Sequence, residues 1–255
     1  MPELLAGKTS LILGVANKWS LAYAIAKAFH REGAQLLLTY QGERQKETVT
    51  ELGSELGAAA IFECDVTRDE DLTRLADTVR QHGRLDTLVH SIAFANREDL
   101  TRPFVETSRA GYLLAQDVSA YSLVSAARTV SPLMTEGGSV ITLSYLGATR
   151  VVPNYNVMGV AKAALEACVR YLSSDLGPSN IRVNAISAGA VKTASARAVG
   201  GLSKMLESMP ARAPLRRNCT PEEVADAAVF LASDLGRGVT GNVLFVDAGY
   251  QVMGS

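Results

Sequence analysis

A tyrosine and a lysine stand seven positions apart in the segment Pro153-Asn-Tyr155-Asn-Val-Met158-Gly-Val-Ala-Lys162. Helical residues advance by about 100° each, so Tyr155 and Lys162 would share one helix face, about 10 Å apart along the axis. A phenol can donate to an oxygen that becomes negative, and a fixed ammonium nearby favours that transfer or holds a ribose diol. The pair therefore predicts a proton-donor site, although a surface tyrosine beside a lysine that extends to solvent would give the same pattern.

A glycine and a serine bracket the turn after the first apolar run, residues 9–13. Gly14 permits a tight turn, and an amphipathic stretch over residues 21–32 begins directly after Ser20. The N-terminus of such a helix offers unpaired N–H groups to a pyrophosphate, and Ser20 adds a hydroxyl. Ala16 and Ser20 stand where the further glycines of a G-x-G-x-x-G motif would be expected. By itself, this segment therefore fits an ordinary turn with a helix cap equally well.

Three later loops strengthen the interpretation of this turn as a phosphate site. Asp65 and Val66 end the third apolar run, and the carboxylate could accept a bond from an adenine amino group. Small residues end the fourth and sixth runs, where a flat cofactor could lie against the backbone of His90-Ser-Ile-Ala-Phe-Ala95 and Asn184-Ala-Ile-Ser-Ala-Gly189. Capping and packing would explain each loop alone. Together, at one edge of a parallel sheet, they predict a dinucleotide groove.

The end of the second run, Thr39-Tyr-Gln-Gly-Glu-Arg44, bears on which dinucleotide is bound. It lacks the acid that often bonds the adenosine ribose, and it lacks an arginine immediately after the strand that would meet a 2′-phosphate. Gln41 can bond a hydroxyl but carries no charge for a phosphate, whereas Arg44 stands within about one helical turn. The sequence therefore favours NAD(H) over NADP(H).

These loops need a scaffold of alternating strands and helices. Longer amphipathic stretches, among them 72–82 and 154–176, separate short apolar runs, and Thr220-Pro-Glu-Glu223 indicates a capped helix start. Because no linker or repeat divides the chain, we predict an α/β fold: one doubly wound Rossmann-type domain over residues 1–255, with a seven-stranded, mostly parallel sheet and six or seven helices on its two faces. The expected strands are 9–13, 35–39, 59–62, 87–90, 139–143, 182–186 and 243–246.

Composition excludes several classes of protein. Of 255 residues, 47% are hydrophobic and the formal net charge is −1, which argues against disorder and gives no basic surplus for nucleic acid. No apolar run approaches the about 20 residues that cross a bilayer, and the start lacks a secretory signal. Three widely spaced cysteines and three scattered histidines predict reduced thiols and no metal site. We expect a cytoplasmic protein that binds neither membrane nor nucleic acid.

Five segments together resemble the short-chain dehydrogenase/reductase superfamily, and more closely its bacterial enoyl-acyl-carrier-protein reductases, which have a Tyr-x6-Lys spacing. The resemblance covers essentially the whole chain. Met158 stands where ketoreductases with the ordinary Tyr-x3-Lys spacing carry their tyrosine. The matching segments are Gly14-Val-Ala-Asn-Lys-x-Ser20, Ser91-Ile-Ala-Phe-Ala95, Ser144-Tyr-Leu-Gly147, Pro153-Asn-Tyr-Asn-Val-Met158 and Arg182-Val-Asn-Ala-Ile-Ser-Ala-Gly189.

The resemblance implies NADH-dependent reduction of the 2,3 double bond of an enoyl thioester in fatty-acid elongation. Hydride would reach C3, Tyr155 would stabilise the enolate, and Lys162 would hold the nicotinamide ribose. In a ketoreductase, negative charge develops at the carbonyl that accepts the hydride. Here it would develop on the thioester oxygen, two carbons from the carbon that accepts the hydride. A tyrosine one turn earlier than in ketoreductases would match the displaced position of that oxygen. Tyr145 would line the acyl pocket with Ala95 and Met158. The implied cofactor contacts are Gly14, Ser20, Leu21, Gln41, Asp65, Val66, Ile92, Lys162, Val191, Lys192, Thr193, Ala194 and Ser195.

Residues 190–213 interrupt the strand–helix alternation and are expected to form a lid over the substrate, a variable surface insertion being the alternative. The candidates for its apolar side are Ala194, Ala196, Ala198, Val199 and Leu202. Acyl carrier protein, the implied partner, is acidic, so Arg197 and Lys204 would contact it unless they are simply solvated charges. The likeness also implies a homotetramer. Ala93 and Ala190 depart from the glycine and proline that relatives often carry.

Two other functions remain open at this point. A 3-ketoacyl reductase or another short-chain carbonyl reductase could carry a displaced tyrosine. A non-catalytic dinucleotide sensor could use the same fold, although a sensor has no need of the Tyr155 and Lys162 pair. Incubation with NADH and either a 2-enoyl or a 3-keto thioester separates these possibilities.

Overall fold

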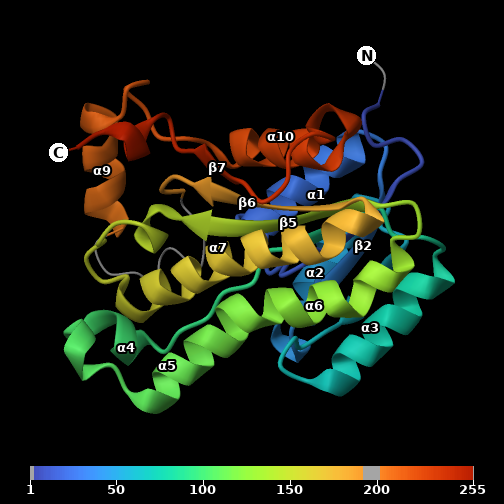
Figure 1. Cartoon of the computed structure of the whole chain (residues 1–255), viewed down its shortest axis with the longest axis horizontal. Helices are drawn as coiled ribbons and strands as arrows, with labels where there is room; N and C mark the ends of the chain where they lie inside the picture. Colours follow the sequence, from blue (N-terminus) through green and yellow to red (C-terminus); the bar gives the residue numbers. More distant parts are fainter. Residues whose placement is uncertain (1–2, 192–201, 255) are drawn as a thin grey trace.

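The first strand explains why the sheet is covered on both faces. In β1 (Thr9–Leu13), Ile12 packs into one hydrophobic core, whereas its neighbours Leu11 and Leu13 pack into a second core. Successive side chains of a strand point to opposite faces, so a strand that is apolar on both faces must lie between two helix layers. The computed structural model, which describes residues 3–191 and 202–254, has this arrangement (Figure 1).

Seven strands form one sheet in the order β3-β2-β1-β4-β5-β6-β7, and every neighbouring pair is parallel. The chain runs outward from β1 to β3, returns to the middle of the sheet, and runs outward again from β4 to β7. The remaining strands are β2 (Gln35–Tyr40), β3 (Ala60–Glu63), β4 (Thr87–His90), β5 (Gly138–Tyr145), β6 (Ile181–Ala188) and β7 (Val243–Val246).

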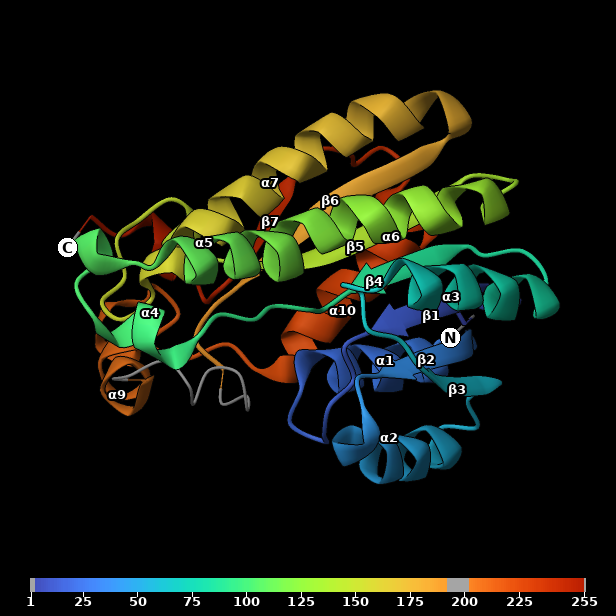
Figure 2. The ribbon, with the colours of Figure 1, turned by 90° about the horizontal axis from the view of Figure 1, so that it is seen from below.

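Helices cover the two faces of this sheet (Figure 2). Residues of α1, α2 and α10 share the first core with the strands, and residues of α3, α6 and α7 share the second core. Their bounds are α1 (Leu21–Arg31), α2 (Glu43–Glu55), α3 (Asp69–Gln81), α6 (Ser122–Val130), α7 (Asn156–Leu176) and α10 (Pro221–Ala232).

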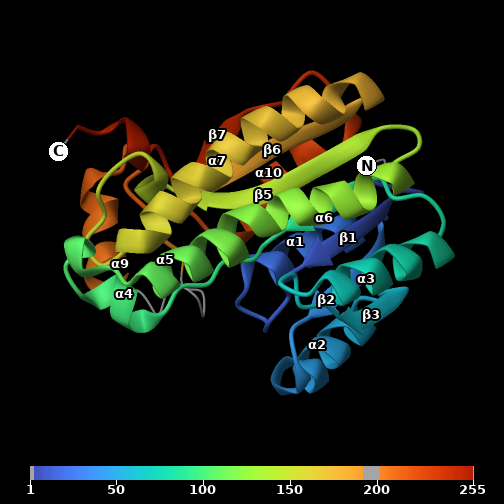
Figure 3. The same ribbon diagram turned by 60° about the horizontal axis from the view of Figure 1, so that its bottom comes forward.

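Three further helices lie at the end of the molecule to which the strands point. They are α4 (Arg97–Thr101), α5 (Arg109–Gln116) and α9 (Leu202–Arg212). Figures 1 and 3 both show them at the end of the molecule toward which β5 points, and α4 and α5 contact α7. In an open α/β sheet this is the edge where ligands bind.

The expected fold class is confirmed, and every predicted strand overlaps an observed one. β5 and β6 each extend two residues beyond their predicted carboxyl ends, because they pair along their whole length as far as Tyr145 and Ala188. The polar residues Ser144 and Ser187 hide these extensions from a search for apolar runs. The described residues contain nine α-helices rather than six or seven, and none of these helices is long and apolar enough to span a membrane.

Candidate active site

The loops after β1 and β4 touch at the middle of the sheet. Gly14 has a φ of +92°, and a Cβ atom built on it would lie 2.3 Å from the carbonyl oxygen of Ser91. Only glycine allows both this backbone conformation and this close approach. The chain reverses direction across the sheet between these two strands, which is where doubly wound folds bind dinucleotides. This close backbone contact leaves no room for a side chain at Gly14, as expected where a cofactor lies across the loop.

Ser20 begins α1 at this point. Its Oγ accepts from the N–H of Tyr23 at 3.3 Å and donates to the carbonyl of Asn17 at 2.7 Å, so it is the N-cap. The N–H groups of the first turn, including that of Leu21, have no acceptor within the helix and carry the positive end of its dipole. Gly14, Ser20 and Leu21 therefore form the kind of N-terminal cradle that holds a pyrophosphate.

Gln41 and Asp65, predicted from two different loops, are hydrogen-bonded to each other. The Gln41 Nε2 donates to Asp65 Oδ2 at 3.0 Å, and Thr67 donates to Oδ1 through both its N–H and its hydroxyl. Partial burial opposes ionisation of Asp65, but the hydrogen bonds from Thr67 and Gln41 outweigh it and lower the pKa of this carboxyl. Asp71 in turn accepts from the N–H of Asp65 at 2.9 Å. An ionised acceptor is thus fixed at the predicted adenosine end of the groove.

The two tyrosines lie together at the other end of the groove. Tyr145 is the last residue of β5 and Tyr155 directly precedes α7; their ring centroids are 5.0 Å apart, with an edge-to-face angle of 67°. Burial raises the pKa of Tyr145 to about 12 and raises that of Tyr155 further, with a smaller contribution from Tyr145. Both phenols are therefore protonated at neutral pH and able to donate.

The helix predicted over residues 154–176 is present, with its start two residues later. α7 begins at Asn156, and Tyr155 lies between Asn154 and Asn156, whose φ values of 61° and 34° are left-handed. The Nδ2 of Asn156 donates to the carbonyls of Leu100 and Arg102 at 3.0 and 2.7 Å. Asparagine tolerates positive φ, so these contacts can hold the turn that begins the helix. Tyr155 is the N-cap of α7, with φ −103° and ψ −28°, and its carbonyl accepts from the N–H groups of Met158 and Gly159 at 2.9 and 3.3 Å. Its position is therefore fixed both by the first turn of the helix and by the contacts of the loop before it.

Lys162 is buried on the second turn of α7, with only 6% of its surface exposed. Its Nζ donates to the carbonyl of Leu143 at 2.7 Å. Burial lowers the pKa of Lys162 to about 8, while the charge of Glu166 acts in the opposite direction. This burial does not fit a lysine that extends from a core helix to solvent.

The expected acyl-pocket residues pack beside these groups. Met158 is buried in a small hydrophobic cluster with Leu100 and Ala161, and Ala95 and Tyr155 pack against it. Val191 is buried after β6, and Ile92 packs against the second core. Predicted residues Lys192, Thr193, Ala194 and Ser195 lie outside the described residues, as do Ala196, Arg197, Ala198 and Val199; nothing is described of the side chains of Leu202 and Lys204.

Two residues that sequence reasoning did not assign support the site. Gly147 lies against the ring of Tyr155, where an added Cβ would be 2.3 Å from Cδ1. Ser119, on a π-helical turn (Asp117–Tyr121) between α5 and α6, accepts from the N–H of Phe94 at 2.9 Å and donates to its carbonyl at 3.1 Å. The glycine after Ser144-Tyr-Leu was the available signal for the first; no local signal indicates the second.

The buried histidine at the end of β4 is structural, as expected. The ring nitrogens of His90 contact the hydroxyls of Thr142 and Ser122 at 3.0 and 2.8 Å. Burial lowers the pKa of His90 to about 3, with a smaller contribution from the charge of Lys162, so the ring is neutral. Among the described residues, no group of three His, Cys, Asp or Glu is arranged to hold a metal ion.

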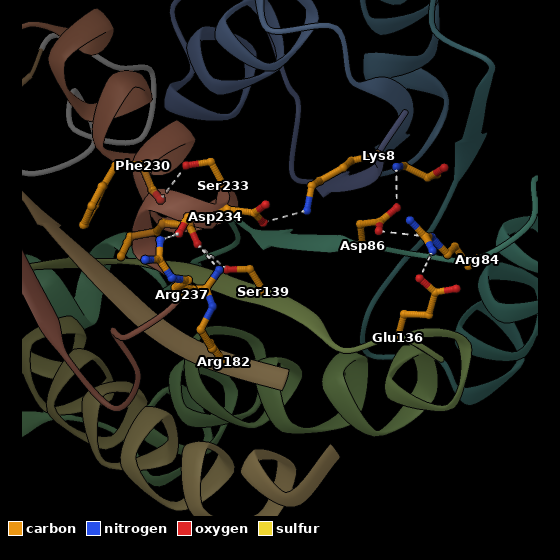
Figure 4. Close-up of polar contacts among 12 residues, drawn as sticks. Lys8, Arg84, Asp86, Glu136, Ser139, Arg182, Phe230, Ser233, Asp234 and Arg237 are labelled. Carbon is orange, nitrogen blue, oxygen red and sulfur yellow. Dashed lines mark hydrogen bonds and ion pairs between the residues drawn. The ribbon is translucent and has the colours of Figure 1, made fainter. Parts of the chain in front are cut away.

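A polar cavity of about 170 Å³ lies at the opposite, amino edge of the sheet (Figure 4). Its charges are largely paired with one another: Lys8 with Asp234 at 3.2 Å, and Arg84 with both Asp86 and Glu136. Arg182 donates to the carbonyls of Leu231 and Val239. We therefore place the candidate site at the carboxyl edge, which holds the glycine cradle after β1 and the tyrosine at the end of β5.

Comparison with known proteins finds relatives along the whole chain. The family described as Enoyl-(Acyl carrier protein) reductase matches residues 14–251. The NADH-dependent enoyl-acyl-carrier-protein reductase FabI of Bacillus cereus is 54% identical over 255 residues, which cover 99% of this chain and 100% of that protein. The Bacillus cereus enzyme in complex with NADP+ and an indole naphthyridinone superposes with a TM-score of 0.97, over 99% of this chain and 100% of that chain, at 54% identity. The Anaplasma phagocytophilum reductase in complex with NAD does so with a TM-score of 0.96 at 45% identity, covering 100% of this chain and 98% of that one.

Proposed function

Because this chain belongs to the enoyl-(acyl carrier protein) reductase family, we propose that it reduces the 2,3 double bond of enoyl thioesters carried by acyl carrier protein, with NADH as the hydride donor. The observation that carries the proposal is the edge-to-face contact of Tyr145 and Tyr155, with the buried Lys162 two helical turns further along α7. The three residues come from the end of β5, the position before α7, and α7 itself.

The cradle fits NADH. Gly14, Ser20 and Leu21 would hold its pyrophosphate, while Gln41 and Asp65 would bind the adenosine half. Val66, Ile92 and Val191 supply apolar walls, and Lys162 would hold the nicotinamide ribose. NADH, when bound, supplies the hydride that adds to C3 of the substrate.

The chain's own residues would then manage the charge that appears on the thioester oxygen. Tyr155 is protonated and partly buried, so it can donate a hydrogen bond to that oxygen in a site of low polarity, where such a bond stabilises an enolate most. The ammonium of Lys162 adds positive charge to the same region. Protonation at C2 completes the saturated thioester.

The position of the tyrosine argues against the alternative function, a carbonyl reductase. Met158 occupies the position four residues before Lys162, and it packs with Leu100 and Ala161 in an apolar cluster rather than presenting a hydroxyl. Tyr155 stands one turn earlier, beside the apolar cluster, where it suits an oxygen remote from the carbon that accepts hydride. An apolar wall next to the donor also suits an acyl chain.

The carrier protein, the lid and the assembly are further parts of the proposal. Acyl carrier protein would deliver the acyl chain past residues 190–213, with Arg197 and Lys204 as its first basic contacts. The family likeness supports a homotetramer in the cytoplasm. Size-exclusion chromatography with light scattering tests the assembly. A KM for the carrier-linked substrate that does not change with salt would contradict the basic docking contacts.

One assay tests the function. The purified protein is incubated with NADH or NADPH and with either a trans-2-enoyl thioester or the matching 3-keto thioester, and loss of the reduced nicotinamide absorbance is followed. We expect oxidation with the enoyl substrate and NADH, and faster turnover with NADH than with NADPH. Reduction of the keto substrate alone would assign the protein to the carbonyl reductases, and no oxidation with any pair would refute the proposal.

A further inference from the structure

Two acid–base side chains of α7, one helical turn apart, hold the last residues of β5. Lys162 Nζ donates to the carbonyl of Leu143 at 2.7 Å, and Glu166 Oε1 accepts from the hydroxyl of Ser144 at 2.5 Å. The next residue along the strand is Tyr145. The helix therefore clamps the strand at both positions that directly precede this tyrosine.

Burial of a carboxyl group such as that of Glu166 costs free energy unless the group is hydrogen-bonded or paired. It is 6% exposed, and burial raises the pKa of its carboxyl, while the hydrogen bond from Ser144 and the charges of Arg170 and Lys162 act in the opposite direction. Lys162 and Arg170 stand four residues before and after it, which places the three on one side of the helix. The carboxyl of Glu166 thus stands on the helix between the buried ammonium and an exposed guanidinium.

We propose that Glu166 is a positioning residue of the reduction: it fixes the end of β5 through Ser144 and supplies the negative charge beside the buried ammonium of Lys162. The inference rests on the proposed function and deepens it. The clamp keeps Tyr145 against Tyr155, and the charge keeps Lys162 a cation where the nicotinamide ribose would lie. Glu166 itself touches neither substrate nor cofactor.

The other titratable groups near Lys162 cannot supply this charge. His90, on β4, is neutral, and Tyr145 and Tyr155 remain protonated. Among the described residues, Glu166 is the acid that opposes the desolvation of Lys162. Removing its charge should therefore lower the pKa of Lys162 further below about 8, so that a larger fraction of the lysine is neutral at a given pH.

Three variants separate the two roles of Glu166. Glu166→Gln keeps an oxygen that can accept from Ser144 but removes the charge, whereas Ser144→Ala keeps the charge but removes the hydrogen bond. Asp175→Asn, an exposed carboxylate of the same helix, is the matched control. For each we would measure kcat and KM with NADH and a 2-enoyl thioester from pH 6 to about 10, NADH affinity by fluorescence, and Tm.

As the pH rises, kcat/KM should fall when Lys162 loses its proton; this fall is the alkaline limb of the pH profile. We expect Glu166→Gln to shift the limb to a pH about one unit lower, so that kcat/KM at a pH above the limb is about tenfold lower than in the wild type. Glu166→Asp, which restores the charge, should return the limb toward the wild-type position. Ser144→Ala should lower kcat and leave the limb in place. Asp175→Asn should match the wild type.

An unshifted limb in Glu166→Gln, with unchanged kcat in Ser144→Ala, would overturn the proposal and leave Glu166 a purely structural residue. Should Glu166→Gln fail to fold, the kcat of Ser144→Ala decides: a lower kcat supports the positioning role, and an unchanged kcat refutes it. If the wild type reduces no enoyl thioester, the proposed function fails. The role of Glu166 is then decided by the pH dependence of NADH affinity. If Glu166→Gln shifts the alkaline loss of NADH affinity to lower pH, the role is supported; if the pH of that loss does not change, the role is refuted.

Discussion

The ring of Tyr145 meets the ring of Tyr155 edge to face, with centroids 5.0 Å apart, although one residue ends a central strand and the other precedes a helix. This contact joins the end of β5 to the start of α7. It places two protonated phenols side by side, where the proposed mechanism needs donors to the substrate oxygen. The predictions below follow from that geometry and from the groups that hold it.

Replacing Tyr155 by Phe should lower kcat by about 100-fold or more, because the change removes the hydrogen-bond donor to the thioester oxygen. NADH affinity should stay near the wild-type value, since the ring still packs against Gly147 and Tyr145. Steady-state kinetics with NADH titration by fluorescence measures both quantities. Unaltered turnover would remove Tyr155 from the mechanism.

Replacing Gly147 by Ala should lower kcat by about 10- to 100-fold, because the added Cβ meets the Tyr155 ring at 2.3 Å and must displace it. Gly177→Ala is the matched control, since a Cβ there meets nothing within 4 Å. We expect the control to retain full activity. Equal kinetics for the two variants would show that the position of the Tyr155 ring does not limit turnover.

The pH dependence of kcat/KM should have an alkaline limb near pH 8. Burial lowers the pKa of Lys162 to about 8, so above that pH the side chain loses its proton and its positive charge, and activity falls. Both tyrosines titrate at higher pH and His90 at lower pH, so neither should produce this limb. In Lys162→Met the limb should be absent from the residual activity. A limb that persists in this variant would assign it to another group.

Replacing Gly14 by Ala should weaken NADH binding strongly and destabilise the fold by more than the about 1–2 kcal/mol that left-handed backbone alone costs. The alanine Cβ would lie 2.3 Å from the Ser91 carbonyl oxygen, at the point where the two central loops touch. Gly83→Ala separates the two effects, because its φ of +94° matches that of Gly14 while a Cβ there meets nothing within 4 Å. Urea unfolding and NADH titration of both variants provide the comparison; indistinguishable results would refute the close approach.

The single tryptophan should report cofactor binding. Trp19 lies in the loop between Gly14 and Ser20, with 51% of its surface exposed. Its emission overlaps the absorption of reduced nicotinamide, so saturation with NADH should quench its fluorescence by energy transfer. NAD+, which lacks that absorption band, is the control and should quench less. Emission that is unchanged at an NADH concentration that supports full turnover would place the cofactor away from this loop.

Much of the fold could be predicted from the sequence because its signals are local. Alternating apolar runs and helices indicated a parallel sheet, and Thr220 with Glu223 indicated the capping box that begins α10. Gly14 and Ser20 marked the phosphate turn for the same reason: a tight turn and an N-cap each depend on a few consecutive residues. Strand ends were less accurate where polar residues such as Ser144 continue the pairing of β5 with β6.

The sequence alone determined which residue types stand at the carboxyl ends of the strands, and those types indicate dinucleotide binding and proton donation. Only the tertiary structure decided how they are used: Tyr155 packs against Gly147 and Tyr145, and Lys162 is buried against Leu143. Glu166 acquires a partner only when β5 and α7 pack together. The physical reason is that burial, pKa and strained backbone depend on contacts between segments far apart in the chain, which no local pattern encodes.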